Sequence, residues 1–287
     1  MSLTLYRVSA FPKDSLGGNE AGVVLDAKGL TDQEMLNIAK RVNYSETAFL
    51  LPGKKADFRL RYFSPTVEVP LCGHATIATF NLMRNLEMVE QKEYTIETNE
   101  GILKVRIEEN TVHLQLAKPK YFEEINPSEI TNALGISKNI LLPTPIQVVS
   151  TGIKEIFMGV KTLESLNALV LDTDKIIALC DKYDAYGLYI FTLETKHNSD
   201  AHGRNFIPPI GIIEESATGT ASGALACYLD KYLDKKQTHF VFEQGYSLFK
   251  PSSIEVKLTK ENDRVTDVYV GGRMRFIDKI VGFNPNN

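Results

Sequence analysis

The stretch Arg61-Tyr-Phe-Ser-Pro65, which leads after a short extended segment into Gly73-His-Ala-Thr-Ile-Ala78, has a second copy in the chain. That copy is Arg204-Asn-Phe-Ile-Pro208, and it leads, after a segment three residues longer, into Gly219-Thr-Ala-Ser-Gly-Ala224. Both copies follow the order R-x-F-x-P, extended segment, G-x-A-[ST]-x-A, helix. A repeat of this kind is typical of a chain with two domains built on one plan.

Hydrophobic periodicity around these copies predicts short strands in alternation with a few helices. A helix is expected from Thr31 to Val42, opened by a capping box of Thr31 and Glu34. The segments 72–86 and 217–232 are small and apolar at helical spacing, which predicts two buried helices. A further helix is expected near 174–180, and strands are expected at 3–10, 22–26, 46–51, 57–63, 94–98, 102–108, 111–116, 146–149, 156–160, 187–192, 239–243, 254–258 and 265–269, with a last strand after 272.

Proline-containing turns gather between residues 117 and 145, where the sequence reads Lys-Pro-Lys, Asn-Pro-Ser and Leu-Pro-Thr-Pro. Such a stretch favours a crossing from one domain to the next. We therefore expect an N-terminal domain of residues 1–118 plus 273–287 and a C-terminal domain of residues 119–272.

Composition narrows the class of protein. The chain has 287 residues and is 43% hydrophobic, which is too apolar for disorder, and no apolar run reaches the ~18 residues of a membrane span. Its net charge of -4, without any long basic cluster, disfavours nucleic acid as a partner. The first ten residues alternate like a strand and carry no secretory signal. A soluble cytoplasmic protein is expected.

The cysteines Cys72, Cys180 and Cys227 are odd in number and far apart, which fits neither a disulfide framework nor a thiolate zinc site. The five histidines show no H-x-x-x-H spacing either. No metal ligand set is therefore expected, although a metal site assembled from distant residues stays open as an alternative.

Gly73 and Gly219 each stand where a strand enters a helix. The first turn of a helix has unpartnered backbone N–H groups and a partial positive charge, so such a terminus favours a carboxylate, and glycine allows close approach. One such run alone is more typical of tight helix packing, whereas two matched runs favour ligand binding. The candidate side chains beside the two junctions are Cys72, His74, Glu214, Glu215, Thr218 and Thr220.

Glu46 opens a strand that is otherwise Thr-Ala-Phe-Leu-Leu. A carboxylate in so apolar a strand either faces solvent or is desolvated, and desolvation raises its pKa toward the range useful for proton transfer. On its own, Glu46 is more typical of a surface strand residue, His74 of a structural histidine and Cys72 of a small buried side chain. The case for chemistry depends on these residues lying together.

Several motifs together closely resemble the PhzF-like family of phenazine biosynthesis isomerases. Order and spacing match over essentially the whole chain, and the combination of S-E-T-A-F with P-L-C-G-H-A-T is highly specific. The motifs are 18-GNEAGV-23, 45-SETAF-49, 59-RLRYFSP-65, 68-EVPLCGHAT-76, 217-ATGTA-221, 243-EQG-245 and 271-GG-272.

The resemblance implies a diaminopimelate-epimerase-like α+β fold, in which each of two similar domains is a curved, mostly antiparallel sheet around a central helix and the active site lies in the cleft between the domains. It also implies a biosynthetic, cofactor-independent isomerase, often a homodimer, that acts on a small cyclic or amino-acid-like carboxylate. Carried over by residue, Glu46 is the general acid/base, while His74 and Glu215 place the substrate. Further substrate contacts are implied for Asn19, Cys72, Gly73, Thr218, Gly219 and Thr220.

Three positions depart from the family pattern. Family members often have Asp-Pro where this chain has Glu215-Ser216, usually Ser at Thr220, and commonly Pro at Glu20. Glu215 is one methylene longer than aspartate and is followed by no proline, so its reach toward a substrate is open. We have no interpretation of Glu20.

The two junctions also bear on mechanism. The related epimerases invert a carbon with one thiol before each junction, whereas this chain has Cys72 before the first and Thr218 before the second. A threonine hydroxyl cannot act as a thiolate at neutral pH, which disfavours two-thiol epimerisation. The sequence favours a same-face proton shift by one carboxylate; the alternatives are a one-base racemase or a lyase, and a catalytically inactive small-carboxylate-binding protein. A cysteine hydrolase built on Cys72 and His74 is disfavoured because no third orienting group is evident.

Overall fold

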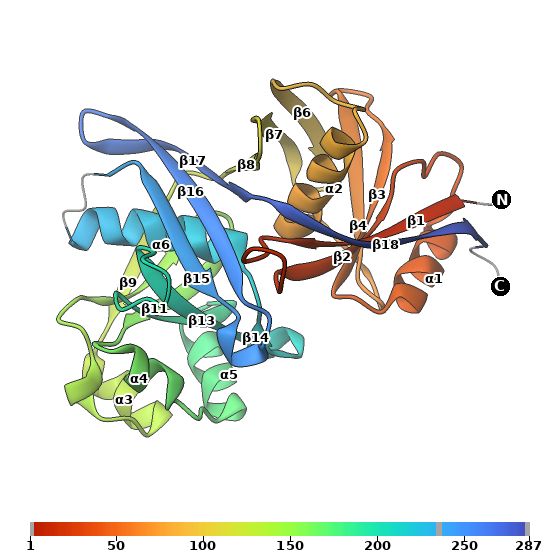
Figure 1. The fold of residues 1–287 in the computed structure, drawn as a ribbon. Coiled ribbons are helices and arrows are strands. Elements are labelled where there is room, and N and C mark those ends of the chain that lie inside the picture. Colours follow the sequence, from red (N-terminus) through yellow and green to blue (C-terminus); the bar gives the residue numbers. More distant parts are fainter. Residues whose placement is uncertain (1–2, 234–236, 285–287) are drawn as a thin grey trace. The chain divides into compact units, whose positions relative to one another are not determined.

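The structure is a computed structural model that describes residues 3–233 and 237–284. The chain divides into two compact units (Figure 1): unit 1 comprises Met1–Gln115 and Gly271–Asn287, and unit 2 comprises Leu116–Val270. No helix among the described residues is both long and apolar enough to cross a membrane.

Unit 1 is a mixed sheet packed against the buried helix α2 (Gly73–Asn85). Neighbouring strands pair in the order β18, β1, β2, β3, β4, β6, β7, β8, with the two-residue β5 beside β4; β2–β3 and β4–β6 are parallel and the other pairs antiparallel. All side chains from His74 to Met83 are buried, so α2 is the core helix of this unit. The other elements are β1 (Leu3–Ala10), β2 (Asn19–Val24), α1 (Asp32–Val42), β3 (Glu46–Pro52), β4 (Phe58–Phe63), β5 (Glu68–Val69), β6 (Glu93–Thr98), β7 (Gly101–Ile107), β8 (Val112–Leu116) and β18 (Met274–Phe283).

Unit 2 repeats this plan around α6 (Gly219–Tyr232), which is buried from Ala221 to Leu229. Its strands pair in the order β9, β10, β11, β12, β13, β15, β16, with β14 beside β13; β11–β12 and β13–β15 are parallel. The elements are β9 (Lys120–Ile125), α3 (Pro127–Leu134), η1 (Lys138–Ile140), β10 (Ile146–Ser150), β11 (Lys154–Gly159), α4 (Leu163–Asn167), α5 (Thr173–Lys182), β12 (Gly187–Thr192), β13 (Ala201–Ile207), η2 (Pro208–Ile210), β14 (Ile212–Glu215), β15 (His239–Gln244), η3 (Tyr246–Leu248), β16 (Ser252–Glu261) and β17 (Arg264–Gly272). The predicted fold, two similar α+β domains each built on a central helix, is confirmed.

The repeated R-x-F-x-P motif performs the same task in both units. Arg61 donates to both oxygens of Glu68, each at 2.7 Å, and its guanidinium carbon lies 5.1 Å from the centre of the Phe63 ring. Arg204 donates to both oxygens of Glu214, at 3.0 and 2.8 Å, and lies 4.8 Å from the centre of the Phe206 ring. The planar guanidinium suits both contacts, so each pair anchors the short strand that leads into the core helix.

One expected strand is corrected, and one segment contains more secondary structure than the sequence predicted. The strand expected at 22–26 is β2 (Asn19–Val24), which begins earlier because Asn19 already pairs with Ala10. The segment 117–145, expected to be a crossing, contains β9, α3 and η1. Its Asn-Pro-Ser sequence is a helix start: the Asn126 side chain accepts the N–H of Ser128, and Pro127 occupies the first turn, where its missing N–H costs nothing.

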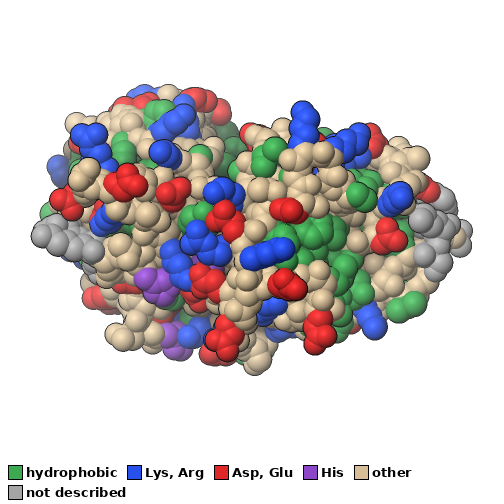
Figure 2. All heavy atoms as spheres, turned by 90° about the horizontal axis from the view of Figure 1, so that it is seen from above, with side chains coloured by type: hydrophobic (Ala, Val, Ile, Leu, Met, Phe, Trp, Pro, Cys, Tyr) green, Lys and Arg blue, Asp and Glu red, His purple; other side chains and the backbone are tan. Residues whose placement is uncertain are grey.

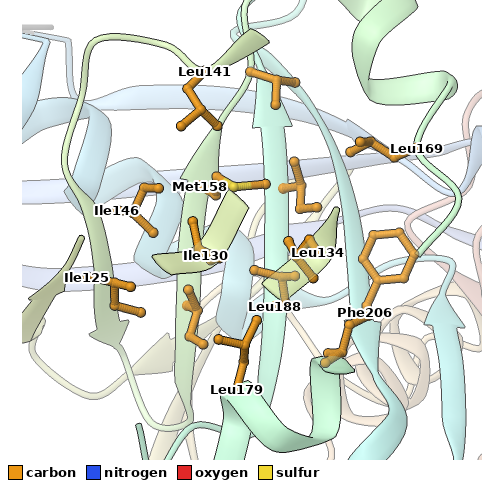
Figure 3. Packing of buried hydrophobic residues seen from close by; sticks show 14 of the residues in the cluster. Ile125, Ile130, Leu134, Leu141, Ile146, Met158, Leu169, Leu179, Leu188 and Phe206 are labelled. Atoms are coloured by element: carbon orange, nitrogen blue, oxygen red, sulfur yellow. The ribbon is translucent and has the colours of Figure 1, made fainter. Parts of the chain in front are cut away.

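A hydrophobic cluster of unit 2, separate from the side chains of α6, fills the space between the sheet and α3 and α5 (Figure 3). Ile130 and Leu134 from α3, together with Leu179 from α5, pack there against Met158 and Leu188 on the strands. On the face seen in Figure 2, acidic and basic side chains are interspersed, in keeping with the small net charge.

Candidate active site

The first cluster of predicted site residues gathers where β2, β3 and the start of α2 meet. Glu46 is the first residue of β3, and its backbone pairs with Ala21 in the parallel β2. The Glu46 side chain is 20% exposed, so it is neither fully desolvated nor on the open surface. The sequence had suggested either a solvent-facing or a desolvated carboxylate. The Glu46 side chain is intermediate, with apolar neighbours in its strand and some access to solvent.

His74 lies in the first turn of α2 and is 6% exposed. Its Nε2 is 3.4 Å from Glu46 Oε2, and its Nδ1 is 3.4 Å from the Asn19 side-chain nitrogen. Burial lowers the pKa of His74, while the charge of Glu46 and a hydrogen bond to the backbone of Glu20 act in the opposite direction. Because an ordinary histidine is already mostly neutral at pH 7, the lowered pKa makes His74 a neutral imidazole there.

Cys72 is the N-cap residue of α2 and is buried at 7% exposure. Its Sγ lies 3.6 Å from Glu46 Oε2 and 3.4 Å from His74 Nδ1. Thr76 donates its hydroxyl to the Cys72 backbone oxygen at 2.7 Å and is itself 2.6 Å from the Tyr62 hydroxyl. These contacts hold the junction between strand and helix in place.

The N-termini of α2 and α6 differ from those of the other helices. Threonine, asparagine or aspartate side chains cap α1, α3, α4 and α5, as the sequence predicted for the capping box of α1. At α2 and α6 the N-cap residues Cys72 and Thr218 make no side-chain capping bond. Among the α-helices of the described residues, these two starts therefore leave their first-turn N–H groups to a ligand or to solvent.

The second cluster lies at the start of α6 in unit 2. The Thr218 hydroxyl donates to Glu215 Oε2 at 2.5 Å, and the Thr218 N–H donates to the side-chain oxygen of Gln244 at 3.1 Å. Gln244 in turn donates to the backbone oxygen of Glu215 at 2.9 Å. Glu215 is thus directed at the helix junction despite its extra methylene. Gly219 is buried and Thr220 half-buried in the same first turn.

A buried acid extends this second cluster into the core. Asn205 donates its side-chain N–H₂ to Thr218 Oγ1 at 3.1 Å and to Glu155 Oε1 at 3.3 Å. Glu155 is 2% exposed, and burial, with a contribution from the charge of Glu215, raises its pKa to about 8. Two buried acceptors of this pair, Glu155 Oε2 and Asn205 Oδ1, have no hydrogen-bond donor among the described residues. A buried carboxylate oxygen without a donor disfavours the charged form, so the environment favours the neutral acid at pH 7.

The Glu243-Gln244-Gly245 motif packs against the turn at Ser216 and Thr218 in the second cluster. Glu243 is 1% exposed, accepts backbone N–H groups of Lys196 and His197, and lies 2.8 Å from His202 Nδ1. Gly245 has φ +81°, and a Cβ there would come within 2.5 Å of the Ser216 backbone oxygen. Only glycine fits, so this motif secures the turn beneath Ser216 and Thr218.

The predicted site residues thus fall into one cluster in each unit. Asn19, Glu46, Cys72, Gly73 and His74 gather in unit 1, whereas Glu215, Thr218, Gly219 and Thr220 gather in unit 2. Their functional roles stay predictions. Sequence reasoning missed Glu155 and Asn205, although Glu155 carries a signal like that of Glu46, a carboxylate directly before the apolar run Ile-Phe-Met of its strand.

Comparison with known proteins places the chain in a family. Residues 8–277 match the family described as phenazine biosynthesis-like protein. The chain is 35% identical over 270 residues to an uncharacterised isomerase of Bacillus subtilis, with 91% of this chain and 92% of that protein covered. It is 28% identical over 272 residues to trans-2,3-dihydro-3-hydroxyanthranilate isomerase of Pseudomonas aeruginosa, with 92% and 94% covered.

A solved structure agrees with these matches. The Bacillus anthracis phenazine biosynthesis protein of the PhzF family superimposes with a TM-score of 0.90 at 30% identity, covering 99% of this chain and 100% of that one. The chain therefore belongs to the phenazine biosynthesis-like (PhzF) family. The predicted resemblance and the predicted enzyme class, an isomerase of this family, are confirmed.

Proposed function

We propose that this isomerase moves a proton within a small cyclic or amino-acid-like carboxylic acid, with Glu46 as the single acid/base group. The observation that carries the proposal is the Glu46 carboxylate, half-buried and 3.4 Å from the neutral imidazole of His74, beside the uncapped start of α2. The Pseudomonas relative supports the substrate class, because its name describes a cyclic amino acid derivative.

In the proposed reaction, one Glu46 oxygen takes a proton from a carbon activated by a neighbouring carbonyl or carboxyl group, and the C–H electron pair moves into the adjacent π system. The first-turn N–H groups of α2, from Gly73 onward, stabilise the oxygen that gains negative charge. The protonated Glu46 then returns the same proton to another carbon of the substrate on the same face. Proton and charge balance without any further reactant.

The other residues of the two clusters receive supporting roles. His74, neutral and fixed beside Asn19, orients a polar group of the substrate without adding positive charge. The backbone N–H groups at Gly219 and the hydroxyl of Thr220 are proposed to bind a substrate oxyanion, with Glu215 and Thr218 beside them. The proposal also includes a cytoplasmic location and a homodimer.

Two-thiol epimerisation does not fit these clusters. Thr218 occupies the second thiol position, and its hydroxyl already donates to Glu215 at 2.5 Å. A threonine hydroxyl ionises far less readily than a thiol, so at neutral pH it is not available as the charged base that two-thiol epimerisation needs. A one-base racemase would use the same Glu46, but the planar intermediate would have to turn its opposite face toward Glu46 before the proton returns to the original carbon.

The test is hydrogen exchange in heavy water with a panel of small cyclic and amino-acid-like carboxylic acids, read by mass spectrometry and by the stereochemistry of the product. We expect one class to shift a proton, and Glu46→Gln to slow turnover by about 10²-fold or more. Glu90→Gln, at an exposed position of unit 1, is the matched control and should keep full activity. Undiminished turnover in Glu46→Gln refutes the assignment, and binding without any exchange favours the inactive carboxylate-binding protein.

A further inference from the structure

The hydroxyl of Thr218, the N-cap residue of α6, lies at the centre of the second cluster. Its oxygen is 3.1 Å from the side-chain nitrogen of Asn205, 3.1 Å from that of Gln244 and 2.5 Å from Glu215 Oε2. A threonine hydroxyl donates one hydrogen bond and accepts two, so these three contacts use its full capacity.

The direction of each of these bonds follows from the partner. The amide of Gln244 is oriented by backbone groups, because its oxygen accepts the Thr218 N–H at 3.1 Å and its nitrogen donates to the Glu215 backbone oxygen at 2.9 Å. The amide nitrogens of Gln244 and Asn205 only donate, so the hydroxyl accepts from both. Its single proton is left for Glu215 Oε2, and the distance of 2.5 Å is typical of a hydroxyl that donates to an ionised carboxylate.

The two amides that fix the hydroxyl are themselves held in the core. Asn205 is fully buried, and its backbone pairs with Glu215 on β14, which places its side chain beside the helix start. The same Asn205 nitrogen donates to Glu155 Oε1 at 3.3 Å, so the amide is held from the core side as well. Gln244 is fully buried at the end of β15. A hydroxyl turned away from Glu215 would leave buried donors unpaired, which is costly.

The first cluster contains a matching contact. Cys72 is the N-cap residue of α2, as Thr218 is of α6, and neither side chain caps its own helix. The Cys72 thiol instead donates to Glu46 Oε2 at 3.6 Å. In each unit the N-cap residue thus directs its proton at one oxygen of a glutamate. The bond in unit 2 is the stronger, because a hydroxyl is a better donor than a thiol.

We propose that Thr218 is a positioning residue that holds the Glu215 carboxylate in place for substrate binding. Asn205 and Gln244 fix the Thr218 hydroxyl, and the hydroxyl fixes one oxygen of the carboxylate, so Glu215 is oriented before a substrate arrives. Preorganisation of this kind favours binding, because the ligand does not have to order the side chain. The contact of Glu215 with the substrate rests on the proposed function, whereas the contact between Thr218 and Glu215 does not.

A double-mutant cycle in urea unfolding tests this contact without any substrate. Thr218→Val removes the hydroxyl at nearly constant volume, and Glu215→Ala removes its acceptor. We expect their effects on the unfolding equilibrium constant to be non-additive by about tenfold, as for a hydrogen bond to a charged group. Thr259→Val, exposed on β16 in the same unit, is the matched control and should combine additively with Glu215→Ala. Additive effects of Thr218→Val and Glu215→Ala overturn the contact.

Steady-state kinetics of the proton shift test the positioning role. Thr218→Val should raise KM about tenfold and change kcat less than about threefold, because Glu46 is untouched, and Thr218→Ser should restore KM. In the Glu215→Ala background, Thr218→Val should have no further effect on KM, since Thr218 acts through Glu215. Circular dichroism monitors folding, and Thr218→Ala replaces Thr218→Val if the latter does not fold.

The outcomes separate this inference from the proposed function. An unchanged KM in Thr218→Val, or an equal rise in both backgrounds, overturns the positioning role, while loss of turnover in Glu46→Gln still supports the proposed function. If no acid of the panel exchanges hydrogen, the proposed function fails, and the urea cycle alone then decides whether Thr218 holds Glu215.

Discussion

The neutral state of Glu155 gives a prediction whose size follows from the structure. Its carboxyl is 2% exposed on β11, and burial raises its pKa to about 8 from the ordinary 4.5. The folded chain therefore holds a proton that the unfolded chain releases between these values. Folding stability is fully present below pH 4.5 and is lost as the pH rises through 8, because in this window the unfolded state binds fewer protons.

The magnitude follows from about 1.4 kcal/mol per pH unit for one proton. The full loss is about 5 kcal/mol, and the part that falls between pH 5 and pH 7.5 is about 3 kcal/mol. Glu155→Gln removes this loss, since the amide is uncharged at every pH. It also preserves the hydrogen bonds, because glutamine accepts from Asn205 with its oxygen and offers an N–H donor in place of the acid proton.

The assay is urea unfolding of both proteins at several pH values from 5 to 7.5. We expect the unfolding free energy of Glu155→Gln, relative to the parent, to rise by about 3 kcal/mol across this range. Other titrating groups cancel in the difference. Glu123→Gln, exposed on β9 in the same unit, should show no such rise. A difference for Glu155→Gln that is flat with pH refutes the neutral buried acid.

Three further substitutions test the structure around the sites. Gly245→Ala should cost at least about 3 kcal/mol of unfolding free energy, because the new Cβ meets the Lys250 backbone oxygen at 2.3 Å. The control Gly29→Ala, at φ +88° in open space, should cost only about 1 kcal/mol. Equal costs in urea unfolding contradict the close approach at Gly245. Thr31→Ala should cost about 1 kcal/mol by removing the capping box of α1, and an unchanged urea midpoint speaks against that cap. Burial tends to raise the pKa of Glu243, but its hydrogen bonds prevail and lower that pKa to about 2, so the carboxylate stabilises the fold above pH 4.5 and this stabilisation is lost toward pH 2. Glu243→Gln should therefore cost about 3 kcal/mol of unfolding free energy at pH 7 and much less near pH 2. A cost that does not change with pH refutes this prediction.

Local signals in the sequence predicted well those features that local interactions determine. The capping box at Thr31 lies within four residues of chain and fixes the start of α1. The Asn126-Pro127 pair was misread because both residues break strands as readily as they open helices, and only the register of the following apolar residues distinguishes the two. Ambiguity of this kind affects single helices or strands, and it did not affect the prediction of the fold class.

Contacts between distant strands could not be predicted in the same way. Asn205 and Glu155 are 50 residues apart and meet only because β11, β12 and β13 are neighbours in the sheet. The grouping of Glu46 with Cys72 and His74 followed from the family resemblance rather than from spacing.

Strand register shows how the two halves of the repeat diverged. Arg61 and Arg204 are equivalent, and their following residues, Tyr62 and Asn205, pair with Ala48 and Tyr189 on the next strand. Counting back two residues on that strand makes Glu46 of unit 1 equivalent to Gly187 of unit 2.

On the next strand, the carboxylate is in unit 2 and the small residue is in unit 1. Ala21 pairs with Glu46, and Glu155 pairs with Gly187, so Ala21 of unit 1 is equivalent to Glu155 of unit 2. The two units thus carry a carboxylate on different strands of the repeat, Glu46 on β3 and Glu155 on β11, and unit 2 has Glu215 at its helix start in addition. The position on β3 leaves Glu46 20% exposed, while the position on β11 leaves Glu155 2% exposed and favours its neutral form. A carboxylate that exchanges protons with a substrate needs access as well as an apolar environment, and of Glu46 and Glu155 it is Glu46 that has both. The asymmetry within the repeat is therefore an argument, independent of family resemblance, for chemistry in unit 1 and a supporting role for unit 2.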